Sequence, residues 1–253
     1  MSAGHQEWTS QSGQDEWIAN EVFPGKERGS FVDVGAHNGK YLSNTYILEN
    51  VFGWQGICVE PNTKLFAELQ ITRTCILENC CLLDEIRLVN YLEVEGDVLA
   101  QAHSGIVDYL GSASYVLPDQ AAATPKQALT LGSLLEKHRF PRVIDYLSID
   151  TEGSEFLILK NFPFEKFRFN AITIEHNNEP LARGLQRALL RKHGYILIKT
   201  HQVDDYWVHR NCPGLIRVLY RKHIKALASW YRILAIRLKS QLKIFLCKLG
   251  LLR

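Results

Sequence analysis

Long apolar runs and closely paired cysteines are missing from this chain of 253 residues. Without a stretch of about 18 uninterrupted apolar residues, a membrane-spanning helix is not expected. The N-terminus is polar as far as Asp15 and lacks the apolar segment of a signal peptide, so we expect a cytoplasmic protein. The six cysteines form no Cys-x-x-Cys pair or other zinc spacing, which argues against a metal or redox role for them.

A low-complexity linker is also missing, and the C-terminal end has no acidic residues. A length of 253 residues with 46% hydrophobic residues favours one α/β domain with a sizeable core. Residues 221–253 hold nine Lys and Arg, which leaves 20 of the 29 basic residues and all 27 acidic ones in residues 1–220. This acidic body argues against a nucleic-acid partner, for which basic charge would be expected.

A short apolar run with a glycine turn, residues 30–39, predicts a buried strand that leads into a helix over residues 40–52. The turn lacks the Gly-x-Gly-x-x-Gly pattern of dinucleotide-binding folds, because Val34, Ala36 and His37 occupy glycine positions in the two possible frames. Asp33 adds a carboxylate at the mouth of the turn, which would repel a diphosphate. The pattern therefore favours a cationic cofactor such as S-adenosylmethionine over a nicotinamide dinucleotide.

The next apolar run, residues 56–59, ends at Glu60. Glu60 follows Gly35 by 25 positions, close to the interval of about 20 at which an acidic residue after the second strand binds ribose hydroxyls. Two carboxylates in this order support a nucleoside-containing cofactor more strongly than the glycine turn alone.

Five motifs occur in a fixed order: SQSGQDEW at residues 10–17, FVDVGAHNG at 31–39, LSNT at 42–45, GWQGICVEP at 53–61 and IDTEGSE at 149–155. Together they resemble the FkbM family of class I S-adenosylmethionine-dependent methyltransferases over roughly residues 10–210. The resemblance implies a Rossmann-like three-layer α/β sandwich with a seven-stranded, mostly parallel sheet and one antiparallel strand. It also implies methyl transfer, most often to a hydroxyl of a sugar, glycolipid or secondary metabolite.

The resemblance further implies which residues bind the cofactor. They lie in the glycine turn, in the Ser-Asn pair after it, at the end of the second strand and in a third strand predicted over residues 75–82: Asp33, Gly35, Ala36, Gly39, Ser43, Asn44, Glu60, Pro61 and Asn79. Residues 1–29, with a short helix over 15–23, would form a lid on this pocket. An irregular segment, residues 95–128, would close over a small-molecule or glycan acceptor.

Candidate catalytic residues follow later strands. Asp150 comes after a predicted central strand, residues 143–149, at the edge where open α/β sheets bind ligands. We expect Glu152 in the first turn of the next helix, and His176 beside Asp150 across the sheet. Asp150, Glu152 and His176 are the candidates for the base that deprotonates a hydroxyl. Alternatively, Asp150 with neighbouring oxygen ligands holds a divalent cation that polarises the hydroxyl.

Residues 221–253 are predicted to form a basic amphipathic helix after a methyltransferase domain of residues 30–220. Its apolar positions recur at steps of three and four, and its basic residues gather on the opposite side: Ile224, Leu227, Tyr231, Leu234, Leu238, Leu242, Phe245 and Leu249 against Lys222, Lys225, Arg232, Lys239 and Lys243. This pattern is typical of a helix lying on an anionic membrane surface. Alternatively, the apolar face packs on the protein's own sheet or pairs two copies in a homodimer.

Two other functional classes stay open from the sequence. One is a non-catalytic membrane-associated adaptor on the same fold, because function depends on sites rather than folds. The other is a methyltransferase that acts on nitrogen or on nucleic acid. Binding and turnover of the cofactor separate an enzyme from an adaptor.

Overall fold

The structure is a computed structural model that describes residues 7–94, 104–109, 122–224 and 227. Contacts divide the chain into two compact units, Met1–Leu215 and Ile216–Arg253. The first unit holds both β-sheets. Within the described residues, no helix is long and apolar enough to cross a membrane.

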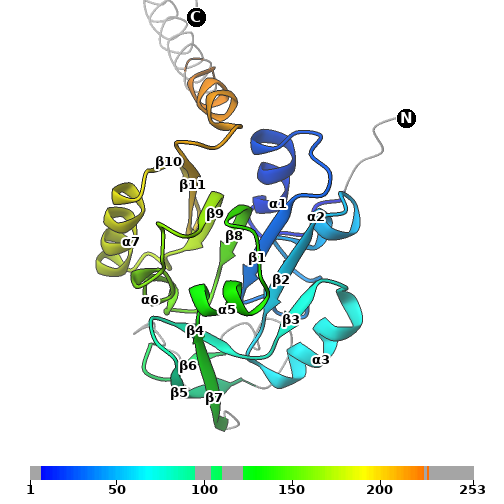
Figure 1. Cartoon of the computed structure of the whole chain (residues 1–253), viewed down its shortest axis with the longest axis vertical. Helices are drawn as coiled ribbons and strands as arrows, with labels where there is room; N and C mark the ends of the chain where they lie inside the picture. The colour runs from blue at the N-terminus through cyan, green and yellow to red at the C-terminus, as the bar shows by residue number, and fades with distance from the viewer. Residues whose placement is uncertain (1–6, 95–103, 110–121, 225–226, 228–253) are drawn as a thin grey trace, which may run out of the picture. The chain divides into compact units, whose positions relative to one another are not determined.

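A seven-stranded sheet forms the centre of the first unit, in the order β10-β11-β9-β8-β1-β2-β3 (Figure 1). Its strands are β1 (Ser30–Val34), β2 (Gln55–Val59), β3 (Ile76–Glu78), β8 (Val143–Ile149), β9 (Arg168–Glu175), β10 (Tyr195–His201) and β11 (Asp204–His209). Strand β11 runs antiparallel to both of its neighbours, and the other neighbouring pairs are parallel. The predicted sheet with one antiparallel strand is confirmed.

Helices cover both faces of this sheet: α1 (Gln14–Glu16), the π-helix η1 (Trp17–Val22), α2 (Tyr46–Asn50), α3 (Thr63–Thr72), α5 (Leu131–Lys137), α6 (Glu155–Lys160) and α7 (Pro180–Lys192). On one face, Val32 and Leu147 join a core cluster with residues of α5, α6 and α7. On the other face, Tyr206 of β11 packs edge-on against Trp17 of η1, with 5.0 Å between ring centroids. Because side chains alternate between the faces of a sheet, this gives the predicted three layers.

A second, four-stranded sheet has the order β4-β7-β5-β6. It consists of β4 (Cys81–Leu83), β5 (Arg87–Glu93), β6 (Gly105–Ile106) and β7 (Ala122–Thr130). The prediction of one strand over residues 75–82 is wrong, because the chain bends at Asn79 and Cys80 and continues into this other sheet as β4. Residues 122–128, predicted as irregular, belong to β7, where they pair with β5. Residues 95–103 and 110–121 of that segment lie outside the described residues.

Two predicted helix starts are also wrong. The helix predicted from residue 40 begins only at Tyr46, because Leu42 has a φ of 54°, which a right-handed helix excludes. Glu152 has a φ of 59° and therefore lies in the loop before α6 rather than in its first turn. Helix α3 is capped by Asn62, since its side chain accepts hydrogen bonds from the backbone N–H groups of Lys64 and Leu65.

The structure describes a helix over residues 215–224, nearly all of it in the second unit. The end of this helix overlaps the helix predicted over residues 221–253. Apart from residues 221–224 and 227, that prediction lies outside the described residues.

Candidate functional site

The site lies at the carboxyl edge of the parallel strands, where β1 ends in the glycine turn. The N–H of Gly35 donates to the carbonyl of Val59 at 3.0 Å, and the N–H of Asp150 donates to the carbonyl of Val34 at 2.9 Å. These bonds fasten the ends of β2, β1 and β8 together. Gly35 has a φ of +85°, and a Cβ at this position would lie 1.7 Å from the carbonyl oxygen of Asp150. Only glycine satisfies both conditions.

Glu60 is buried directly beside this turn. Its carboxylate accepts the backbone N–H of His37 at 2.9 Å and that of Asn62 at 2.8 Å. Burial raises the pKa of Glu60 to about 8, although both hydrogen bonds act in the opposite direction. The side-chain amide of Asn79 donates to the carbonyls of Glu60 at 2.7 Å and Pro61 at 3.0 Å. Asn79 thus positions the end of β2 through the backbone.

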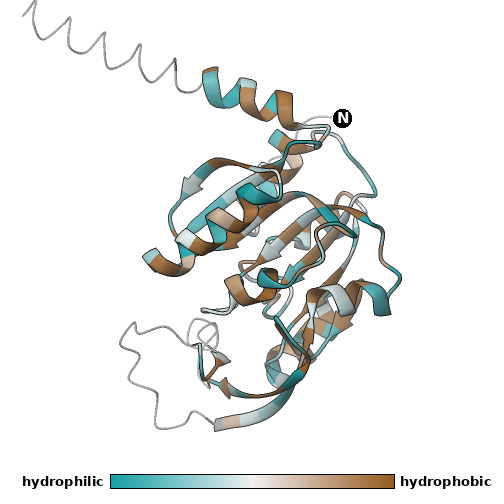
Figure 2. Ribbon diagram, turned by 60° about the vertical axis from the view of Figure 1, so that its left-hand side comes forward, coloured by the Kyte–Doolittle hydropathy of each residue, from teal (hydrophilic) through white to brown (hydrophobic). Residues whose placement is uncertain are grey.

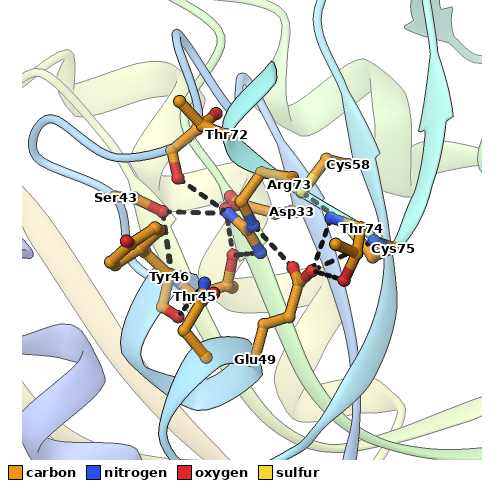
Figure 3. Close-up of polar contacts among 12 residues, drawn as sticks. Asp33, Ser43, Thr45, Tyr46, Glu49, Cys58, Thr72, Arg73, Thr74 and Cys75 are labelled. Carbon is orange, nitrogen blue, oxygen red and sulfur yellow. Dashed lines mark hydrogen bonds and ion pairs between the residues drawn. The ribbon is translucent and has the colours of Figure 1, made fainter. Parts of the chain in front are cut away.

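Asp33 differs from the sequence prediction, which placed its carboxylate at the mouth of the turn. It is 3% exposed and accepts the hydroxyl of Thr45 at 2.6 Å. Arg73 lies beside it and donates to Glu49 at 2.6 Å and to Thr45 at 2.9 Å (Figure 3). Burial raises the pKa of Asp33 more than Arg73 and Thr45 lower it. Asp33 therefore belongs to a buried polar network below the turn.

Arg73 also connects this network to the glycine turn and the Ser-Asn pair. Its guanidinium donates to the carbonyl of Gly39 at 3.1 Å and to the hydroxyl of Ser43 at 3.3 Å. The Ser43 hydroxyl in turn accepts the N–H of Tyr46 at 3.1 Å and so precedes the first turn of α2. No sequence motif had pointed to Arg73, because its partners lie 24 to 34 positions away in the chain.

Asn44 lies between the turn and the central strand β8. Its amide nitrogen donates to the hydroxyl of Ser148 at 2.8 Å. Its amide oxygen is buried and has no hydrogen-bond partner among the described residues. A buried acceptor without a partner is costly, so this oxygen is available to a donor on a ligand.

Three carboxylates gather where β8 and β9 end. One oxygen from each of Asp150, Glu152 and Glu175 lies within 4.8 Å of the other two. Asp150 and Glu175 share a hydrogen bond, and the amide of Asn177 donates to Glu175 at 2.8 Å. Burial raises the pKa of all three groups, that of Glu152 to about 8 with the charge of Asp150 as the next cause. The structure thus brings two of the candidate bases, Asp150 and Glu152, together with Glu175 at the end of β9.

Glu155 closes the loop before α6. Its carboxylate accepts the backbone N–H groups of Thr151 at 3.0 Å and Gly153 at 2.9 Å. These bonds hold the backbone on either side of Glu152. Glu155 therefore orders the loop that carries a candidate base.

The sequence predicted that His176 would lie beside Asp150. In the structure, His176 does not join the three carboxylates. Its Nε2 lies 3.7 Å from Asp205, and its Nδ1 accepts the N–H of Asn178 at 3.0 Å. Since consecutive strand residues point to opposite faces, Glu175 and His176 cannot face the same side. Burial and the charge of Arg183 lower the pKa of His176.

Two elements that the sequence motifs did not indicate also reach the site. Asp204 of β11 pairs with Glu175 across the strands, and its carboxylate accepts the amide of Gln14 at 3.0 Å. The N-terminal segment is thereby tied to the carboxyl edge, where it had been predicted as a lid. Tyr91 of β5 comes from the second sheet, and after burial the charges of Glu60 and Glu152 raise the pKa of its hydroxyl.

Acidic side chains thus surround the glycine turn. Burial raises the pKa of six of them and so favours their neutral forms: Asp33, Glu60, Asp150, Glu152, Glu175 and Asp204. A cationic ligand would favour their ionised forms. A diphosphate would raise their pKa values further, because a like charge disfavours the ionised form.

Comparison with curated protein sequences gives no significant match. Among solved structures, the METTL16 MTase domain (crystal form 2) is 9% identical, with a TM-score of 0.43 over 76% of this chain, which spans only 64% of that domain's length. Precorrin-6y C5,15-methyltransferase from Geobacter metallireducens GS-15 is 11% identical (TM-score 0.37; 77% of this chain, 86% of that chain). Human methyltransferase 10 domain containing protein is 10% identical (TM-score 0.40; 77% and 78%).

A family model gives the decisive match. The methyltransferase FkbM domain matches residues 33–197, more than half of the chain. The matched region contains the glycine turn, Glu60 and the three clustered carboxylates. The chain therefore belongs to the FkbM methyltransferase family.

Proposed function

We propose that this methyltransferase transfers the methyl group of S-adenosylmethionine to a hydroxyl oxygen of a sugar, glycolipid or secondary metabolite. The observation that carries the proposal is the placement of acidic groups on both sides of one glycine turn. Strand β1 lies between β2 and β8. Glu60 therefore lies on one side of Gly35, and Asp150 with its neighbours Glu152 and Glu175 on the other.

The buried groups around the turn fit this cofactor. Glu60 would accept the ribose hydroxyls, because each of its carboxylate oxygens retains a lone pair beside the backbone N–H that it already accepts. Asn44 would accept from the cofactor's ammonium with the oxygen that lacks a partner among the described residues. When bound, S-adenosylmethionine supplies a methyl group on a sulfonium, and the leaving thioether departs neutral. No general acid is therefore needed on that side.

The acceptor hydroxyl requires a base, and Asp150 has the surroundings of one. Burial raises the pKa of both Asp150 and Glu175, so this pair keeps one proton, which Glu175 donates to Asp150. The ionised Asp150 then has a pKa above that of an exposed carboxylate and accepts a proton more readily. Glu152, with a pKa of about 8, is the second candidate.

A divalent cation, the alternative expected from the sequence, would use the same carboxylates. Oxygen ligands from Asp150, Glu152 and Glu175 are the type that Mg²⁺ and Ca²⁺ prefer. Such a cation would polarise the hydroxyl in place of a base. Chelation distinguishes the two chemistries, since only the second depends on a metal.

The experiment is a two-stage binding and transfer assay. Calorimetric titration should give saturable binding of S-adenosylmethionine and S-adenosylhomocysteine, and none of a reduced nicotinamide dinucleotide. Radiolabelled methyl groups should then pass to hydroxylated acceptors in a panel that also contains amines and RNA. Absence of cofactor binding would contradict the proposal as a whole and favour an adaptor. Transfer to an amine or to RNA would contradict the assignment to oxygen.

A further inference from the structure

The helix at the start of the second unit exposes a continuous apolar stripe. Ile216 is 83% exposed, Tyr220 65%, Ile224 46% and Leu227 56%. Successive members are four, four and three positions apart, which places them on one face of an α-helix. Figure 2 shows hydrophobic and hydrophilic residues alternating along this helix.

The stripe lies on the side of the helix opposite a buried residue. Val218 is 1% exposed and is two positions from both Ile216 and Tyr220. At about 100° per residue, two positions correspond to roughly 200° around the axis, so Val218 faces the opposite way. The apolar stripe is therefore distinct from the side of the helix that is buried.

The sequence extends this stripe with a strongly basic segment. Positions at steps of three and four continue the apolar pattern: Tyr231, Leu234, Leu238, Leu242, Phe245 and Leu249. Residues 221–253 hold nine Lys and Arg and no Asp or Glu. An apolar face on a segment of high net positive charge is complementary to an anionic lipid surface, in which acyl chains lie beneath negative headgroups.

We propose that this helix is a peripheral membrane-binding surface that recognises anionic phospholipid. The apolar stripe from Ile216 to Leu227 inserts at the boundary between headgroups and acyl chains, and the lysines contact the headgroups. A second copy of the chain is a poorer occupant, because two segments with nine positive charges each would repel one another. The binding is independent of the methyl-transfer activity and does not rest on it.

Co-sedimentation of the full-length protein with vesicles tests the proposal. Vesicles of phosphatidylcholine with phosphatidylserine should bind the protein, vesicles of phosphatidylcholine alone should bind it much less, and high salt should release it. Ile216→Ser with Tyr220→Ser and Ile224→Ser should abolish binding. Replacing Lys222, Lys225, Lys239 and Lys243 by Gln should weaken binding to the anionic vesicles about fivefold for each charge near the surface.

A matched control uses equally exposed apolar residues of the first unit. Ile71 is 86% exposed and Leu181 78% exposed, so Ile71→Ser with Leu181→Ser removes exposed apolar surface without touching the stripe and should leave binding unchanged. Circular dichroism of each variant should match that of the wild type, which checks that the variant is folded. The proposal is overturned if the stripe variant binds vesicles as well as the wild type. It is equally overturned if the wild type ignores anionic vesicles and instead forms a dimer that the stripe variant loses in analytical ultracentrifugation.

Discussion

The backbone carbonyl of Asp150 occupies the space that a side chain at Gly35 would need, 1.7 Å from the ideal Cβ position. This contact joins the turn on the cofactor side to the loop that carries the proposed base. Neither can shift without the other, because Asp150 is also held to Val34 by its backbone N–H. The relative position of the glycine turn and the proposed base is thus determined largely by backbone.

Gly35→Ala should therefore destabilise the protein severely and abolish cofactor binding. Gly25→Ala is the matched control, because Gly25 has a φ of +73° but no atom within 4 Å of its Cβ position. The control carries only the left-handed backbone cost of about 1–2 kcal/mol. Urea denaturation should show a distinctly larger loss for Gly35→Ala. Equal losses for the two variants would mean that the close approach to Asp150 has no energetic consequence.

Arg73→Met should cost about 3–5 kcal/mol of unfolding free energy, because it leaves buried carboxylates without their cationic partner. The side chains of Arg73 and Glu49 are 0% and 7% exposed. The control is Lys160→Met, which breaks a surface pair with Asp84 and should cost no more than about 1 kcal/mol. Adding Glu49→Met to Arg73→Met should recover part of the loss in urea denaturation. A loss for Arg73→Met as small as the control would contradict the structural role of this ion pair.

The sequence predicted those features that depend on contiguous residues. The strand over residues 143–149 is observed with the predicted bounds, because this mostly apolar run, interrupted only by Asp145 and Ser148, ends before Asp150. The glycine turn and the acidic residue after the second strand were readable for the same reason. The family motifs supplied the strand order, which no local pattern contains.

The sequence could not predict contacts that join distant residues through side chains. Gln14 and Asp204 are 190 positions apart, and nothing local to either one indicates the other. Leu42 shows a related limit. Its left-handed backbone lies in a segment whose composition favours a helix, and the helix begins only after it, at Tyr46. His176 was misplaced because strand alternation was not applied across the strand end.

The stability of the protein should fall as the pH rises from about 4.5 to about 8. Burial raises the pKa of Glu60 and Glu152 from 4.5 to about 8, and that of Asp204 from 3.8 to about 7. Between these values the folded state binds more protons than the unfolded state, so raising the pH favours unfolding. Glu152→Gln should flatten this dependence in thermal melts. Glu85→Gln, at a side chain 69% exposed, should not change it, and a wild-type stability that rises over this range would contradict the shifts.

Cofactor affinity should rise with pH through about 8, because ribose hydroxyls donate to the ionised form of Glu60 and its pKa in the free protein is about 8. Glu60→Gln should weaken binding by about 10- to 150-fold at pH 9, as expected for hydrogen bonds to a charged group. It should also remove that part of the pH dependence. Calorimetry across this pH range measures both effects, and a wild-type profile that Glu60→Gln leaves unaltered would exclude Glu60 from the ribose site.

Asp150→Asn should lower turnover by about 10²- to 10⁴-fold, the usual contribution of a general base, with little effect on cofactor affinity. The fold should remain intact, because the bond from the backbone N–H of Asp150 to Val34 does not involve the side chain. Glu155→Gln is the control for loop order, since Glu155 holds the backbone of Thr151 and Gly153 and its loss should lower melting temperature and turnover together.

Treatment with a chelator should leave the wild-type rate unchanged. A rate that falls on chelation and recovers with Mg²⁺ would indicate that a bound cation, rather than a base, activates the acceptor hydroxyl. Unaltered turnover of Asp150→Asn would remove Asp150 from the chemistry altogether and leave Glu152 as the base to test next.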